Sequence, residues 1–243
     1  MVDAPDPQGA GAAAGRNFVI GLSGGSGAVY ALRLIDVLLG AGAALHVVVT
    51  GAARRVLRFE AGLPVGPGPV APELLAPAVQ GDDALRARLT VHDLAAVEST
   101  PASGSARLDG VVLCPCSMGT LARVTHGLST NLLERSADVA LKEGRRLIVV
   151  PRETPLSVVH LRNMLALAEA GAVVLPAMPG FYHRPERVED LVDFVVARIV
   201  DKLGVALELV ERWKTPAGGG GATPWDEEED PIGSGPAAPG EDG

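Results

Sequence analysis

The sequence predicts an α/β domain built on a mostly parallel β-sheet with helices on both faces. Short apolar runs alternate along the chain with longer segments whose apolar residues recur at helical spacing. Such alternation favours βαβ units, in which the strands are parallel and buried. Small and polar residues directly follow several of the apolar runs. Parallel sheets bind ligands at the carboxyl ends of their strands, so these segments are where a site is expected.

Six apolar runs are expected to be the strands of this sheet. In chain order they are residues 17–22, 44–50, 89–92, 110–114, 146–150 and 172–175.

Helices are expected between these strands. The helix at residues 27–39 has four apolar residues at helical spacing: Val29, Leu32, Ile35 and Leu39. One or two short helices are expected within 72–89, after a loop rich in Pro and Gly. The other expected helices are residues 52–61, 118–126, 131–142, 156–170 and 185–203.

Composition indicates one domain with a tail at each end. The chain has 243 residues and is 47% hydrophobic but only 3% aromatic, so its core must consist mainly of Ala, Val and Leu. The domain is expected at 16–214, between disordered tails at 1–15 and 215–243. No run of about 18 apolar residues predicts a membrane span, and the first residues do not resemble a secretory signal. A cytoplasmic location is therefore expected.

The negative charge of the chain is concentrated in its last segment. The net charge is −8, and residues 215–243 hold seven acidic residues and no Lys or Arg, which leaves −1 for the remainder. A nearly neutral domain lacks the basic excess of a nucleic-acid-binding protein. The acidic tail fits either a solubilising role or the binding of a partner.

The two cysteines are expected to be reduced thiols at the end of a buried strand. Cys114 and Cys116 are separated only by Pro115, so a disulfide between them would be strained. Two thiols without further ligands also make a poor metal site. The histidines have no metal-ligand spacing, and no metal is expected.

The first strand is followed by a Gly/Ser-rich turn at residues 21–27 (GLSGGSG). Glycines at the start of a helix let the backbone approach a phosphate, but they equally suit a tight turn. The segment has neither the Lys of a P-loop nor the spacing of the dinucleotide fingerprint. On its own it leaves both interpretations open.

Three later strand ends also carry unusual residues. Ser117 and Thr120 follow the strand at 110–114 and offer hydroxyl groups, although Ser117 could simply cap a helix. Arg152 and Glu153 follow the strand at 146–150 and suit phosphate binding and proton transfer, or a structural ion pair. After them, Thr154 is expected to cap a helix with Pro155 in its first turn.

The last of these segments is Phe181-Tyr182-His183. It could close over a ligand or plug the core.

Together these segments resemble the UbiX/Pad-type flavin prenyltransferases. The segments that carry the resemblance occur in the family's order: GLSGGSGAVYALRL, VTGAARRVLRFE, LCPCSMGTLARV, LLERSADVALKE, VPRETPLSVVHLRNM, MPGFYHRP and the closing Arg212-Trp213. The resemblance covers roughly residues 17–214, and its R-E-T-P-L and F-Y-H-R-P segments are highly specific.

The resemblance implies a flavodoxin-like, Rossmann-type three-layer sandwich and a homododecamer. It implies that reduced FMN accepts a dimethylallyl group at N5 and C6 from dimethylallyl monophosphate, without a metal. The product would be the cofactor of a UbiD-type decarboxylase.

The resemblance also assigns roles to individual residues. The matches to FMN-binding positions are Gly24, Gly25, Ser26, Thr50, Ser117, Met118, Gly119, Thr120 and Arg152. The matches to donor-phosphate ligands are Lys142, Arg135, Tyr182 and Arg198, with Trp213 closing over the site. Catalytic roles are implied for Glu60 with Ser26 near flavin N5, for Glu153 as acid/base, and for Lys142.

The chain departs from the family pattern in its 63–69 loop (LPVGPGP), at Met118-Gly119 and in its acidic tail. Two other functions are weighed against the transferase. One is a flavin-dependent cysteine-type decarboxylase, which uses a P-A-S-A-N-T segment and a catalytic His that are not found at the matching positions here. The other is an FMN carrier or accessory subunit, which would not need the donor-site residues.

Overall fold

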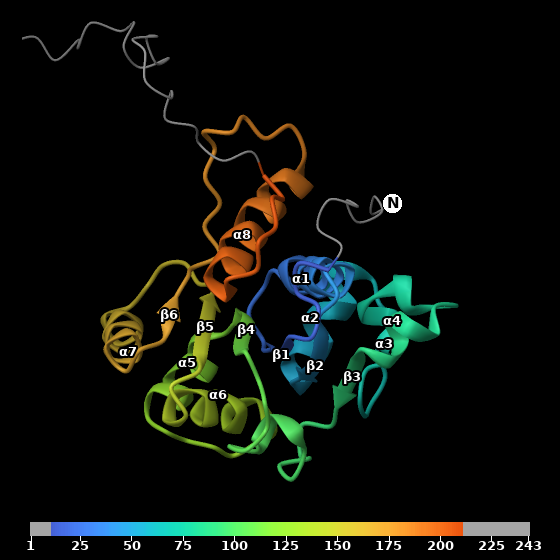
Figure 1. Ribbon diagram of the computed structural model, residues 1–243. Coiled ribbons are helices and arrows are strands. Elements are labelled where there is room, and N and C mark those ends of the chain that lie inside the picture. The colour runs from blue at the N-terminus through green and yellow to red at the C-terminus, as the bar shows by residue number, and fades with distance from the viewer. Residues whose placement is uncertain (1–10, 211–243) are drawn as a thin grey trace, which may run out of the picture. The chain divides into compact units, whose positions relative to one another are not determined.

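The computed structural model describes residues 11–210, in which all six predicted strands form one parallel sheet (Figure 1). Their order is β3-β2-β1-β4-β5-β6. The predicted α/β class is confirmed. The strands are β1 (Asn17–Leu22), β2 (Ala44–Val49), β3 (Leu89–His92), β4 (Gly110–Cys116), β5 (Arg146–Pro151) and β6 (Val173–Val174).

The strand order reverses between β1 and β4. The chain builds β1, β2 and β3 outward to one edge and then returns to place β4 on the other side of β1. The carboxyl ends of β1 and β4 therefore border a topological switch point, the usual ligand site of such sheets.

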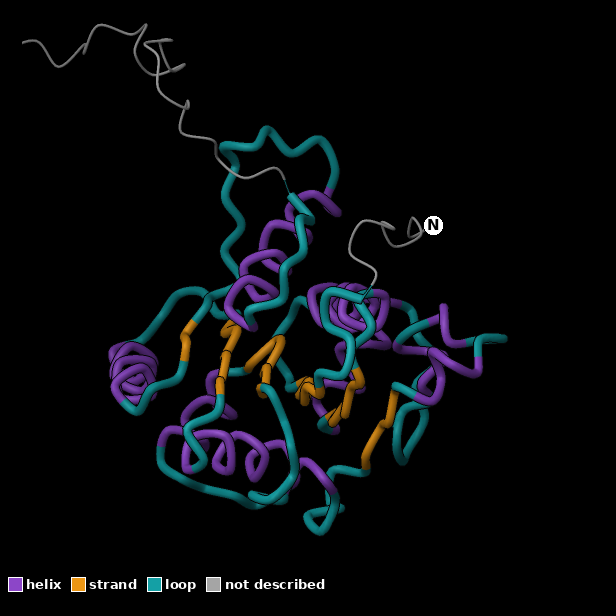
Figure 2. The backbone as a smooth tube through the Cα atoms, in the orientation of Figure 1, coloured by secondary structure: helices purple, strands orange, loops and turns teal. Residues whose placement is uncertain are grey.

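Helices pack on both faces of the sheet, as Figure 2 shows. Phe18 and Ile20 belong to the hydrophobic cluster that includes α1 (Ala28–Gly40) and α8 (Val188–Leu203). Val19 belongs to the cluster that includes α5 (Met118–Thr125) and α6 (Leu132–Lys142). This division follows from the alternation of side chains along a strand. The helices are α1 (Ala28–Gly40), α2 (Gly51–Ala61), α3 (Pro72–Leu75), α4 (Asp83–Ala87), α5 (Met118–Thr125), α6 (Leu132–Lys142), α7 (Val158–Glu169) and α8 (Val188–Leu203).

No helix within residues 11–210 is long and apolar enough to cross a membrane.

The predicted N-terminal tail is too long by several residues. Residues 11–15 form turns, and the Ala13 side chain is fully buried in the core. The Ala13 N–H donates to the carbonyl of Ala41 over 2.8 Å, which fixes this segment beside the end of α1. The amino-acid composition of this segment does not reveal the buried methyl group and the hydrogen bond that hold it in place. Residues 1–10, Trp213 and the predicted acidic tail lie outside the described residues.

Two predicted helix starts are also wrong. The helix after β5 begins at Val158, and its cap is Ser157 rather than Thr154. Ser157 Oγ accepts the His160 N–H over 3.2 Å, while His160 Nδ1 accepts the Ser157 N–H over 3.3 Å, so the two residues satisfy each other. The last helix begins at Val188 instead of residue 185.

The cysteines lie where the sequence places them. Cys114 and Cys116 are both buried and form no disulfide. They lie near the end of β4, which runs two residues further than predicted. Burial raises the pKa of the Cys116 thiol to about 12, so it is protonated at neutral pH.

Candidate active site

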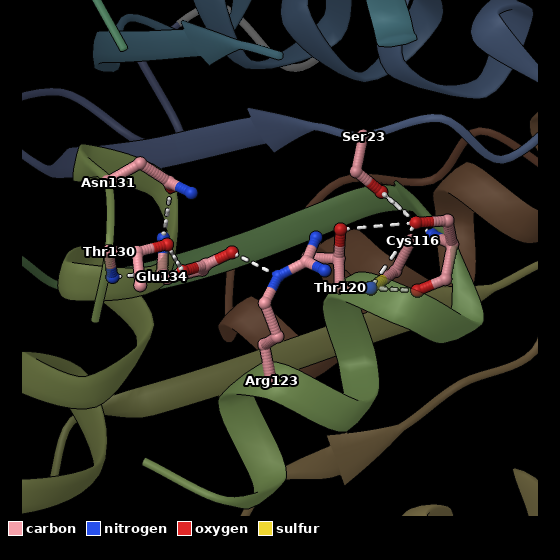
Figure 3. A network of polar contacts seen from close by, with 8 residues as sticks. Ser23, Cys116, Thr120, Arg123, Thr130, Asn131 and Glu134 are labelled. Carbon is pink, nitrogen blue, oxygen red and sulfur yellow. Dashed lines mark hydrogen bonds and ion pairs between the residues drawn. The ribbon is translucent and has the colours of Figure 1, made fainter. Parts of the chain in front are cut away.

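A buried serine joins the turns that follow β1 and β4. Ser23 Oγ donates to the carbonyl of Pro115 over 3.0 Å and accepts the Ser117 N–H over 2.7 Å. Figure 3 shows Ser23 beside the segment that carries Cys116 and Thr120. Ser23 is 1% exposed, so these bonds are protected from water. Ser23 was not among the predicted site residues, although its place directly after a strand was a signal. Its effect is to hold both sides of the switch point in one arrangement.

The segment after β4 begins a helix whose first turn is partly open. Ser117 caps α5, because its Oγ accepts the Thr120 N–H over 3.4 Å and lies 3.1 Å from Thr120 Oγ1. Met118 and Thr120 are buried, whereas Gly119 is exposed. The first N–H groups of a helix have no partner within it, so those of Met118 and Gly119 suit a ligand's acceptors. The cap interpretation of Ser117 is confirmed without excluding its predicted role in FMN binding.

The Gly/Ser-rich turn after β1 binds a carboxylate from its own chain. Glu60, at the end of α2, accepts the N–H groups of Gly27 and Ala28 at Oε2, over 2.8 and 2.9 Å. The Ser26 side chain is a further hydrogen-bond partner of Glu60. The N–H groups at the start of α1 thus already have an acceptor within the chain. A bound phosphate would need the N–H groups of a different helix start. The structure brings the two predicted partners Ser26 and Glu60 together across 34 positions of sequence.

Glu60 is held in its charged form. Glu60 is exposed, and the partial loss of water around its carboxyl group would by itself raise the pKa. Hydrogen bonds from Ser26, Ala28 and Gly27, with the positive charge of Arg152, outweigh that effect and hold the pKa below its ordinary value. Glu60 is therefore a carboxylate at neutral pH, suited to accepting a proton or stabilising positive charge.

The start of α2 is the open helix end beside this turn. Thr50 caps it by accepting the Ala53 N–H over 3.1 Å, which leaves the N–H groups of Gly51 and Ala52 at the helix start. Gly24 packs directly on Ala52, and a Cβ at Gly24 would lie 2.7 Å from the Ala52 Cβ. Only glycine permits this approach. A helix start of this kind suits a phosphate group.

Arg152 carries an unsatisfied nitrogen at the same edge of the sheet. Its backbone N–H donates to the carbonyl of Cys116 over 3.3 Å, which places the residue next to the end of β4. The side-chain Nε is buried and has no hydrogen-bond partner among the described residues. A buried guanidinium donor without a partner fits an acceptor atom of a bound group such as FMN. Neighbouring Glu153 is half-buried, and its Oε1 accepts the Thr154 N–H over 3.1 Å.

Two of the predicted donor-phosphate ligands, Tyr182 and Arg198, are associated with α8. Tyr182 packs edge-on against Phe194 of α8, with 5.6 Å between ring centroids. Arg198 follows Phe194 by one helical turn and is therefore on the same side of α8. Arg198 is more than half exposed and lies 3.7 Å from Asp201.

The structure does not bring the other two predicted ligands to this place within one chain. Lys142 and Arg135 lie on α6, which packs on the opposite face of the sheet from α8. Lys142 ends α6 just before β5 begins, so it is at the amino edge of the sheet, whereas Glu60 and Arg152 are at the carboxyl edge. Each pairs with an acid on or beside its own helix: Lys142 with Glu143 over 2.5 Å and Arg135 with Asp138 over 2.9 Å.

Known proteins resemble this chain over most of its length. A profile of the Flavoprotein family matches residues 10–200. The flavin prenyltransferase UbiX of Synechocystis is 45% identical over 196 residues, which are 81% of this chain and 95% of the relative. The enzyme of the same name from Pseudomonas aeruginosa is 45% identical over 194 residues, covering 80% and 92%.

Solved structures agree with this relationship. AnUbiX (PadA1), crystallised with FMN and dimethylallyl pyrophosphate, is 36% identical with a TM-score of 0.71, covering 82% of this chain and 97% of its own. A dodecameric FMN-dependent UbiX-like decarboxylase from Escherichia coli O157:H7 is 36% identical with a TM-score of 0.69, covering 82% and 99%. The cysteine decarboxylase TvaF is only 19% identical and shares the fold alone. The chain belongs to the Flavoprotein family and, within it, to the UbiX-type flavin prenyltransferases.

Proposed function

We propose that this protein transfers the dimethylallyl group of dimethylallyl monophosphate to N5 and C6 of reduced FMN, and that its product serves a UbiD-type decarboxylase. The observation that carries the proposal is the joined cluster at the carboxyl edge of the sheet, where Ser26, ionised Glu60 and Arg152 lie beside two open helix starts. A cytoplasmic place of action is part of the same proposal.

The residues at this edge fit FMN. The open start of α2, with Thr50 and Gly51, would take its phosphate, and Gly24 and Gly25 permit close approach of the backbone. Gly25 is buried, and a Cβ there would lie 3.4 Å from the backbone of Cys116. Ser117, Met118, Gly119 and Thr120 would supply hydroxyl and N–H groups, and the unpartnered Nε of Arg152 would donate to an acceptor of the ring. Reduced FMN supplies the nucleophilic nitrogen and a π surface.

The chain's own residues handle charge and protons. A monophosphate leaves slowly unless its charge is neutralised, and Arg198, Lys142 and Arg135 are cations suited to that task. Glu153 would protonate the departing phosphate through its carboxyl group. Glu60 would hold the Ser26 hydroxyl by their hydrogen bond and accept a proton at its carboxylate. Tyr182 and Trp213 would exclude water from the site.

The separation of Lys142 from Glu60 supports a homo-oligomer, for which we propose a dodecamer. A neighbouring copy would then bring its Lys142 to the carboxyl edge of this chain. The outer face of α7 supports such packing, because four large apolar side chains are 51–62% exposed on it: Val158, Val159, Leu161 and Leu165. One 36% identical relative is dodecameric.

The test is to incubate the full-length protein anaerobically with reduced FMN and dimethylallyl monophosphate and to measure the mass of the released flavin. A gain of one five-carbon prenyl unit is the expected result. Unmodified FMN, with the diphosphate donor tried as well, would contradict the transferase and favour a flavin carrier. The Glu153→Gln variant gives a second test. An enzyme should lose prenyl transfer and still bind FMN, whereas the FMN binding of a carrier should not change and no transfer would be seen in either protein.

A further inference from the structure

The segment between β6 and α8 contains a histidine whose ring nitrogens are unsatisfied. Nδ1 and Nε2 of His183 are shielded from solvent, and neither has a hydrogen-bond partner within residues 11–210. A neutral imidazole carries one donor and one acceptor, so both of its polar functions lack a partner. Burying such groups is unfavourable and uncommon in native proteins, so each case calls for an explanation.

Aromatic packing holds the His183 ring in place. The ring stacks on Phe194 of α8, with 5.4 Å between centroids and 9° between planes. Tyr182 stands edge-on to both rings, 5.8 Å from His183 and 5.6 Å from Phe194. Gly180 allows this close approach, because a Cβ there would lie 3.1 Å from Phe194 and 3.2 Å from Tyr182. In this arrangement the aromatic contacts leave both ring nitrogens without a partner among residues 11–210.

The next residue has an unfavourable backbone conformation. Arg184 has a φ of 52°, and it is the one residue other than glycine with a positive φ in the described part of the chain. A side chain makes this left-handed conformation costly, and such strain is often found at functional sites. Residues 183 and 184 therefore combine unsatisfied polar atoms with backbone strain, which lowers the energy needed to adopt a second arrangement.

The unsatisfied nitrogens gather at the edge of the candidate site. Among the described residues, three side chains have buried nitrogens without partners: Arg145, Arg152 and His183. Arg152 follows β5, and the His183 segment follows the adjacent strand β6, tied to β5 where the Ala177 N–H donates to the Pro151 carbonyl over 3.0 Å. Arg145 alone lies at the opposite edge, before β5. Arg152 and the segment of His183 therefore both follow strands at the carboxyl edge of the sheet, where ligands are expected.

We propose that His183 is a further ligand of the donor's phosphate group, an inference that rests on the proposed function. Its ring packs against Tyr182 and against the helix that carries Arg198 one turn beyond Phe194, so it stands among the ligands that the family resemblance assigns. Because neither nitrogen is accessible in the present arrangement, residues 181–184 must shift when the donor binds. The shift brings a ring N–H to a phosphate oxygen and satisfies a group that is now without a partner.

The test is calorimetric titration of dimethylallyl monophosphate into the full-length protein loaded with FMN. The flavin is kept oxidised so that no transfer takes place and binding alone is measured. His183→Phe keeps an aromatic ring against Phe194 and removes both nitrogens. We expect the donor Kd to rise about tenfold or more, the FMN affinity to stay unchanged, and the thermal midpoint to equal or exceed that of the wild type. Wild-type donor affinity in this variant would overturn the proposal.

Two further variants separate hydrogen bonding from packing. His183→Gln keeps an N–H donor, and its donor Kd should stay within about threefold of the wild type. A loss as large as that of His183→Phe would assign the effect to the ring and contradict the proposal. His126→Phe is the matched control, because His126 is exposed at the end of α5, and it should leave donor affinity unchanged.

Inorganic phosphate identifies the part of the donor that is recognised. Its affinity should fall in the same proportion as that of the donor in His183→Phe, and an unchanged phosphate affinity would refute a phosphate contact. These binding results do not depend on turnover. A wild-type protein that binds the donor but does not prenylate reduced FMN would contradict the proposed function and leave the role of His183 intact.

Discussion

Around Glu60, hydrogen bonds join distant segments of the chain, whereas the cations proposed to bind the donor pair with acids close to them in sequence. Ser23 connects the turns after β1 and β4, and Glu60 connects the end of α2 to the start of α1. Among the proposed donor ligands, Arg198 approaches Asp201, and Lys142, at the opposite edge of the sheet, pairs with its neighbour Glu143. The proposed acceptor side thus lies within a single chain. The proposed donor side would draw on residues that one chain leaves apart.

The acceptor and donor sides of the proposed site should therefore respond differently to substitution. A group that is already bonded within the chain is preorganised for its ligand, which lowers the cost of binding. A cation that is exposed and loosely paired contributes little to stability but can contribute strongly once a ligand excludes water. Changes on the acceptor side should therefore affect both folding and chemistry, and changes on the donor side chemistry alone.

Glu60→Gln should have the largest effect. The amide lacks the charge that binds Ser26 and the N–H groups of Gly27 and Ala28, so we expect prenyl transfer to slow by about 10²–10⁴-fold. Because Glu60 is exposed, the stability loss in urea unfolding should be only about 1 kcal/mol. Glu73→Gln, in an exposed ion pair with Arg86, is the control and should change neither quantity. A Glu60→Gln enzyme with more than about a tenth of the wild-type rate would contradict this role.

Lys142→Met should slow transfer by about 100-fold without lowering the unfolding midpoint, because the Lys142–Glu143 pair is exposed. If a neighbouring copy supplies Lys142, co-assembled Lys142→Met and Glu60→Gln subunits should regain roughly a quarter of the wild-type activity, since random pairing leaves that share of sites intact. Activity is measured on the purified mixed oligomer. A mixture as inactive as either variant alone would show that both residues act in the same chain's site.

Arg152→Lys should weaken FMN binding by about tenfold, because an ammonium group cannot reproduce the directed Nε donor of the guanidinium. Quenching of flavin fluorescence measures the affinity. Arg145→Lys is a matched control, since Arg145 also has a buried unsatisfied nitrogen but lies at the other edge of the sheet, where it bonds the Gly104 carbonyl. Equal losses of FMN affinity in both variants would show that Arg152 does not bind the flavin directly.

The smallest effect concerns a pair of histidines outside both halves of the site. His46 Nδ1 lies 2.9 Å from His92 Nε2, and burial, with the proximity of His92, lowers the pKa of His46 to about 4. A lowered pKa means that the neutral form stabilises the fold above the unfolded value of about 6.5, and that this stability is lost as the pH falls toward 4.

The pH dependence of unfolding tests this pair. Between pH 6.5 and 4, the wild type should lose about 1 kcal/mol more stability than His46→Leu, allowing for solvent screening of a half-exposed pair. FMN affinity should be the same in both proteins at pH 7. Parallel pH profiles for the two proteins would show that the pair does not titrate as stated.

The local features of the fold were predictable from the sequence. The apolar runs of the six strands, the helix periodicity and the capping hydroxyl of Ser117 are signals carried by neighbouring residues. The parallel arrangement then placed the candidate residues at the strand ends. Helix starts were less certain, because the bond between Ser157 and His160 competes with the expected cap at Thr154.

The sequence by itself therefore determined the α/β class, the six strands and the segments from which the site is built. Only the tertiary structure decided that Glu60 rather than a phosphate satisfies the start of α1, that His46 meets His92, that Ala13 enters the core, and that Lys142 lies at the edge opposite Glu60. The physical reason is the distance along the chain over which each kind of signal acts. Periodicity and turn chemistry act between residues a few positions apart, whereas these contacts depend on strand register and side-chain direction across the whole sheet.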